Sequence, residues 1–136
     1  MDCQADRYGA GRRSRFFYDI EDALSRAIAH HVRYEFEDKN GETRRERNIR
    51  FGRDDLNPDI EIQEDHGHLW DWFWDLSSSR SIGFNGPNPI SVTDIANWAA
   101  LTGTIVRREE VGIIRAMDAA YISAVAEEHA TETGKE

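Results

Sequence analysis

The sequence predicts a mainly α-helical protein, in which a compact C-terminal three-helix unit follows an N-terminal helix and a β-hairpin. Three observations support this prediction. Apolar residues recur in four segments with the period of an α-helix face. Three of the four tryptophans fall within residues 68–76, so a single helix carries much of the large aromatic surface. One Asn-Gly pair, at residues 40 and 41, is the strongest local signal for a hairpin.

The N-terminal half divides into an arm, a helix and a hairpin. Residues 1–15 are small and polar, and they predict a flexible arm. Residues 16–32 predict an amphipathic helix, because apolar side chains recur at helical spacing and acids occupy the early turns, where the helix dipole favours anions. Residues 34–38 alternate aromatic and acidic side chains, and residues 43–51 form a basic run after the Asn-Gly pair. These two arms predict the β-hairpin, which would be marginally stable unless it is docked.

A predicted linker separates the two halves of the chain. Residues 52–66 contain Gly52, Asn57 and Pro58 among many acids, a composition that is typical of a connection. We therefore expect residues 16–61 to form one unit and residues 62–129 to form a second, helical unit.

Three helices are predicted within the second unit. The first covers residues 65–77 and carries the tryptophan cluster. The next opens with a capping-box pattern from Ser91 to Asp94 and ends at Gly103. The last covers residues 107–128 with an apolar stripe at 3.6-residue spacing, and a polar tail over residues 130–136 follows it.

Composition narrows the possible functions. The 136 residues carry a net charge of −9, which argues against general affinity for nucleic acid. No apolar run has the roughly 20 residues that a membrane span needs. Cys3 is the single cysteine, and the first residues lack the apolar stretch of a signal peptide, so we expect a cytoplasmic protein.

Two residue clusters were considered as sites of chemistry. His66 and His68 lie beside acids, and a small hydrolase or metal enzyme could use them, but residues two apart do not share a helix face. Asp71 and Asp75 are four apart on one predicted helix, where a solvated polar face explains them more simply than acid–base catalysis. No catalytic residues, cofactor or metal are predicted, and we expect the protein not to be an enzyme.

A DNA-binding helix-turn-helix is the alternative interpretation of the last two predicted helices. Arg107 and Arg108 stand near the start of the second of them, where base-reading side chains occur. Glu109 and Glu110 follow directly, and residues 62–136 carry five Lys/Arg against twelve Asp/Glu. A small nucleic-acid-binding regulator therefore stays the second choice, and an αα-hairpin packed as core is favoured.

Several blocks of the C-terminal half resemble one known family in the same order. The blocks are His68-Leu69-Trp70-Asp71-Trp72-Phe73-Trp74-Asp75-Leu76, Gly83-Phe84-Asn85-Gly86-Pro87-Asn88-Pro89-Ile90-Ser91, Ile95-Ala96-Asn97-Trp98-Ala99-Ala100-Leu101-Thr102-Gly103 and Val111-Gly112-Ile113-Ile114-Arg115-Ala116-Met117-Asp118-Ala119-Ala120-Tyr121. Together they cover about residues 66–126, and they resemble the C-terminal region of tail assembly chaperones from long-tailed phages and prophages.

This resemblance implies an assembly factor. Such chaperones coat the tape measure protein, recruit the major tail protein and are absent from the mature virion. The expected partners are therefore these two proteins, with self-association also possible, and neither a membrane nor a nucleic acid is expected. Helical spacing directs most of the tryptophan cluster inward, which leaves four residues as the predicted partner contacts: Trp72, Phe84, Asn85 and Pro87.

Overall fold

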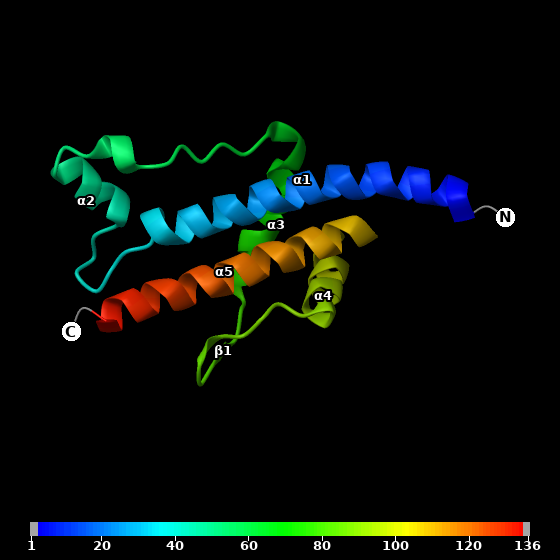
Figure 1. Ribbon diagram of the computed structural model, residues 1–136. Coiled ribbons are helices and arrows are strands. Elements are labelled where there is room, and N and C mark those ends of the chain that lie inside the picture. Colours follow the sequence, from blue (N-terminus) through cyan, green and yellow to red (C-terminus); the bar gives the residue numbers. More distant parts are fainter. Residues whose placement is uncertain (1–2, 135–136) are drawn as a thin grey trace.

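Two long helices, which run side by side in the same direction, form the frame of the molecule (Figure 1). The computed structural model describes the backbone of residues 3–134 and the side chains of residues 15–131. Helix α1 spans Cys3–Glu35, and helix α5 spans Arg108–Gly134. The prediction of a mainly α fold is confirmed. The flexible arm predicted over residues 1–15 falls largely outside the described side chains and stays a prediction.

Shorter elements join and cover the two long helices. After α1 come helix α2 (Arg44–Arg50) and two 3-10 turns, η1 (Asp54–Leu56) and η2 (Glu64–His66). Helix α3 (Gly67–Ser78) precedes a small antiparallel hairpin of strands β1 (Ile82–Gly83) and β2 (Gly86–Pro87), and helix α4 (Val92–Thr102) leads into α5. The predicted helices over residues 16–32, 65–77, 91–102 and 107–128 are all present, and α5 continues through most of the predicted tail. Among the described helices, none is long and apolar enough to cross a lipid bilayer.

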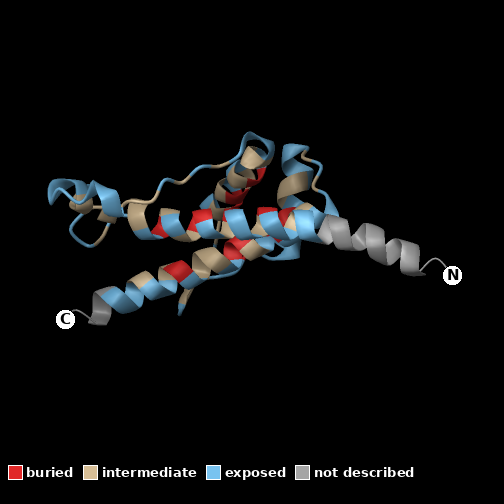
Figure 2. Cartoon of the chain, turned by 45° about the horizontal axis from the view of Figure 1, so that its top comes forward, coloured by how far each residue is buried: buried red, intermediate tan, exposed pale blue. Residues whose placement is uncertain are grey.

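The core draws side chains from both halves of the sequence. Buried residues line the facing sides of the two long helices (Figure 2). Ile28 of α1, Phe73 of α3 and Ile114 of α5 are completely buried in one cluster. The other members come from the same helices, from α4 and from the loop before α4, namely Ile20, Leu24, Leu69, Leu76, Ile90, Ile95, Ile113 and Met117. The division into units 16–61 and 62–129 stays a prediction, and α1 shares its core with the second of them.

The β-hairpin predicted over residues 34–51 is wrong. The turn itself exists: Gly41 has a positive φ of 77°, and a single bridge pairs Glu37 with Thr43. The return arm, however, is helix α2, because Thr43 and Glu46 form a reciprocal capping box that satisfies backbone N–H groups at its start. Arginine and glutamate also favour a helix over a strand. The observed hairpin is the shorter one at residues 82–87.

The boundaries of α4 follow the predicted signals. Ser91 accepts a hydrogen bond from the Asp94 N–H at 3.0 Å, and Asp94 accepts one from the Ser91 N–H at 2.9 Å. The helix ends at Gly103, whose φ of 67° is the left-handed conformation that glycine adopts without strain. The capping-box interpretation of Ser91 and Asp94 is confirmed.

Candidate partner-binding surface

The hairpin carries the most exposed aromatic side chain of the described residues. Ile82 pairs with Pro87 and Gly83 with Gly86, which leaves Phe84 and Asn85 at the tip. Phe84 is fully exposed, Asn85 is exposed and Pro87 is half-buried. Figure 1 shows this hairpin projecting from the body of the molecule. The structure thus brings three of the four predicted contact residues together on one projecting loop.

The hairpin is closed at its base by Asn88. The Asn88 N–H donates to the Ser81 carbonyl oxygen, and the Asn88 side-chain amide donates to Ser81 Oγ, each at 3.0 Å. A Cβ on Gly83 would lie 2.6 Å from Asn88 Oδ1, so a larger residue there would displace the Asn88 side chain that closes the stem. These two hydrogen bonds close the base of the hairpin.

Trp72, the fourth predicted contact residue, lies between α3 and α4. Its side chain is half-buried, with ring centroids 4.8 Å from His68 and 5.7 Å from Trp98. Trp98 in turn donates its indole N–H to Asp75 at 2.7 Å. Trp72 is thus part of an aromatic contact between two helices, on a different element from the hairpin tip.

A groove lies at the base of the hairpin. It has a volume of about 320 Å³ and lies between the end of α3, the base of the hairpin and α4. Arg80, Pro89, Trp98 and Leu101 are among its lining residues. Leu101 is 88% exposed, and Ile82 on the hairpin is 81% exposed. Apolar side chains left in water around a groove are typical of a surface that a partner covers.

Sequence reasoning missed a buried ion pair beside this groove. Arg80 and Asp118 have side chains only 5% and 4% exposed, and Arg80 Nη2 lies 2.5 Å from Asp118 Oδ1. Asp118 follows Met117 within the apolar stripe of α5, and an acid in such a stripe is the signal that could have found the pair. Arg80 stands alone in a segment predicted to be irregular and carried no signal of its own.

The residues considered as sites of chemistry are dispersed. His68 pairs with Glu110 of α5 at 2.7 Å, whereas the His66 ring lies near Phe16 of α1. Asp71 is exposed, and Asp75 accepts the Trp98 indole N–H. Within residues 15–131, no three His, Cys, Asp or Glu side chains lie together as metal ligands would. The geometry gives none of these residues a catalytic arrangement.

The helix-turn-helix alternative finds little support at the start of α5. Arg107 and Arg108 are exposed there, but exposed Glu109 shares their turn and the Arg107 N–H is held by Glu110. The following turns of α5 bury Ile113 and Ile114 in the core. Helix α5 therefore packs into the core along much of its length.

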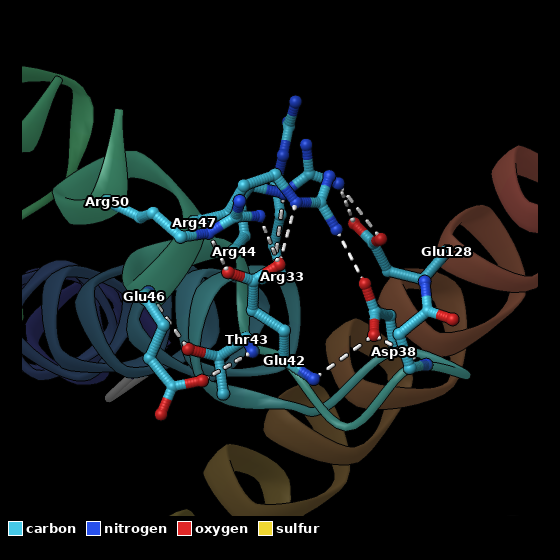
Figure 3. Close-up of polar contacts among 10 residues, drawn as sticks. Arg33, Asp38, Glu42, Thr43, Arg44, Glu46, Arg47, Arg50 and Glu128 are labelled. Atoms are coloured by element: carbon cyan, nitrogen blue, oxygen red, sulfur yellow. Dashed lines mark hydrogen bonds and ion pairs between the residues drawn. The ribbon is translucent and has the colours of Figure 1, made fainter. Parts of the chain in front are cut away.

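The basic run over residues 43–51 is neutralised internally, as Figure 3 shows. Arg44 donates to the Arg33 carbonyl oxygen at 3.3 Å and lies 3.0 Å from Glu128 of α5. Arg47 pairs with Asp38 at 2.7 Å and Arg50 with Glu42 at 2.8 Å, while Arg45 pairs with Glu35. The arginines thus hold α2 against the ends of α1 and α5.

The acids in this network are stabilised in their charged form. Backbone N–H groups of Glu42 and Asn40, with further help from Arg47, lower the pKa of Asp38. The hydrogen bond from Arg50 lowers the pKa of Glu42. Since each cation already has an anionic partner, this patch offers little net charge to a nucleic acid.

The described residues form a small helical protein with an exposed aromatic loop next to a groove of mixed polarity. The sequence model of one family, described as phage tail assembly chaperone, matches residues 54–123, slightly more than half of the 136 residues. The chain therefore belongs to the phage tail assembly chaperone family, and the resemblance predicted from the sequence is confirmed. No curated protein and no solved structure matches the chain significantly.

Proposed function

We propose that the protein binds the tape measure protein of its phage and recruits the major tail protein during tail assembly, in the cytoplasm of the bacterial host. It acts by binding alone, without catalysis, and leaves before the virion is mature. Membership of the chaperone family supports this role. The matched region includes the projecting hairpin, the groove and α4.

The observation that carries the proposal is the full exposure of Phe84 on a braced loop. A phenylalanine in water contributes nothing to folding, and its burial against a partner is worth about 1.5–3 kcal/mol. Ile82 on the hairpin and Leu101 in the groove are further exposed apolar side chains in this region. We assign the first contact with the tape measure protein to this surface, with Asn85 and Pro87 completing the loop.

The negative charge of the C-terminal half favours a partner segment that is basic. Residues 62–136 carry seven more acids than Lys and Arg. Complementary charge speeds encounter and discourages association between like-charged copies. Self-association through the groove would therefore work against this charge.

Co-expression with the tape measure protein tests the proposal. The wild-type chain is expected to keep the tape measure protein soluble and to co-purify with it, and the complex is expected to retain major tail protein. Phe84→Ser should weaken this complex, whereas Phe51→Ser should not, because Phe51 is also an exposed phenylalanine (65%) but lies between α2 and η1. A soluble tape measure protein without the chain, or no co-purification, would refute the proposed function.

Trp72 needs a separate variant, since it also packs against Trp98. Trp72→Phe keeps an aromatic ring in that contact, and Trp72→Ala removes it. If Trp72 contacts the partner, both variants bind less well while Trp72→Phe keeps its thermal stability. Unchanged binding of both variants would show that Trp72 is not a contact residue.

A further inference from the structure

Both ends of the partner-binding hairpin are tied to one carboxylate. Arg80 precedes β1, Ile90 follows β2, and Asp118 lies in the middle of α5. Asp118 Oδ1 is 2.5 Å from Arg80 Nη2, and Asp118 Oδ2 accepts the Ile90 N–H at 2.8 Å. A single side chain of the helical body thus fixes where the chain enters the hairpin and where it leaves.

The Arg80 guanidinium also contacts the segment that follows β2. Its Nη1 donates to the Asn88 carbonyl oxygen at 2.9 Å, so it also bridges from one stem of the hairpin to the other. Its guanidinium carbon lies over the Tyr121 ring, 4.5 Å from the ring centroid. A planar guanidinium can face the Asp118 carboxylate, the Asn88 carbonyl oxygen and the Tyr121 ring together, which suits arginine better than lysine at this position.

Stability alone does not account for such a pair. Burying two charges is expensive, and replacing a buried ion pair by apolar residues of similar volume is often neutral or stabilising. The core beneath the pair is already apolar, with Phe73, Ile90 and Met117 buried. Arg80 also contacts Ser77 Oγ of α3 at 3.3 Å, and the other polar partners of the pair are the Asn88 carbonyl oxygen and the Ile90 N–H, which lie where the chain leaves the hairpin. A purely apolar contact would not fix the position of this segment.

We propose that the Arg80–Asp118 pair is a positioning pair, which holds the hairpin so that Phe84 is presented beside the groove. This role rests on the proposed function, because it assigns the pair to the presentation of the partner-binding loop. Both residues act through the orientation of the hairpin.

The double variant Arg80→Met/Asp118→Leu separates positioning from stability. It replaces the pair by apolar side chains, so any fall in the urea midpoint detected by tryptophan fluorescence should come from the Ile90 N–H, which loses its acceptor. The Asn88 N–H is bonded to Ser81 and to neither mutated side chain. Since a free two-stranded hairpin is only marginally stable, hydrogen exchange of this amide should become faster by about tenfold or more.

A matched control removes another ion pair on α5. Arg44→Gln/Glu128→Gln breaks the pair at the far end of that helix and should leave the exchange of Asn88 unchanged. The affinity for tape measure protein should fall by about tenfold in the Arg80/Asp118 variant, the loss that follows from disordering one buried anchor, and stay constant in the control.

Two results would overturn the positioning role. One is an unchanged exchange rate at Asn88, which would mean that the hairpin is held by its own stem. The other is a faster exchange rate with undiminished binding in a wild-type protein that does bind, which would mean that presentation of Phe84 does not matter. If the wild-type chain bound no tape measure protein, the proposed function would fail, and the exchange measurement would decide the positioning role by itself.

Discussion

Replacing Ile28 by alanine tests whether the first helix and the C-terminal helices share one core. Ile28 lies on α1 and is completely buried against residues of α3 and α5. Truncating a buried isoleucine to alanine costs about 2–5 kcal/mol, from the lost burial and the cavity left behind. With a urea dependence of about 2 kcal/mol per molar, the unfolding midpoint should fall by roughly 1–2.5 M.

Tryptophan fluorescence is the appropriate assay, because none of the four tryptophans lies on α1. Trp70, Trp72 and Trp74 belong to α3, and Trp98 belongs to α4. A shift of their unfolding transition caused by a change on α1 can only be transmitted through the shared core. Tyr18→Ala, at a 64% exposed position of the same helix, is the control and should change stability by less than about 0.5 kcal/mol.

The refuting result is specific. If Ile28→Ala reduced the helical signal in circular dichroism but left the tryptophan transition in place, α1 would be a separate unit. The division between residues 16–61 and 62–129 would then describe the folding of the chain.

Three further predictions concern the backbone, a half-buried histidine and the arginine network. Gly103→Ala should destabilise the folded protein by about 1–2 kcal/mol, because Gly103 has a φ of +67°. Gly112→Ala should stabilise it by about 0.5–1 kcal/mol, because Gly112 lies inside α5 with open space around the new Cβ. Equal effects of the two substitutions on urea unfolding would contradict this prediction. Burial among aromatic rings lowers the pKa of His31, and the charge of Glu35 opposes this shift. The neutral imidazole therefore stabilises the fold above the ordinary histidine pKa of about 6.5, and this stabilisation is lost as the pH falls toward the lowered pKa of the folded state. An NMR titration midpoint at or above about 6.5 would contradict this prediction. Helix α2 buries none of its residues and is held by ion pairs. Molar salt should therefore accelerate hydrogen exchange of the Phe51 amide without affecting that of the Met117 amide. Equal protection of Phe51 at low and high salt would show that the ion pairs do not hold α2.

Local signals predicted much of the helical frame. The apolar period located the helices, and the Ser91 and Gly103 signals located the ends of α4, because each depends on residues a few positions apart. The same kind of signal was overlooked at Thr43 and Glu46, whose capping box begins α2. The alternating residues before the Asn-Gly turn favour a strand, whereas the capping box of Thr43 and Glu46, three residues apart, favours a helix, and the structure has the helix.

Long-range features could not be predicted in the same way. Periodicity showed that residues 16–32 have an apolar face, but not that this face meets α5. The Arg80–Asp118 pair joins residues 38 positions apart, so no local pattern contains it. The candidate contacts at Phe84, Asn85 and Pro87 were predicted from a turn and a resemblance, whereas the bracing of that turn by α5 required the structure.

Direct binding of the tape measure protein tests the central claim. The purified chain should bind the tape measure protein of its own phage, and Phe84→Ser should weaken binding by roughly ten- to hundredfold, the equivalent of the burial of one phenylalanine side chain. Phe51→Ser should bind as the wild type does, and both variants should unfold at the wild-type urea midpoint because both side chains are exposed. Equal affinities of the two variants would contradict the assignment of the hairpin, and no binding by the wild-type chain would contradict the proposed function itself.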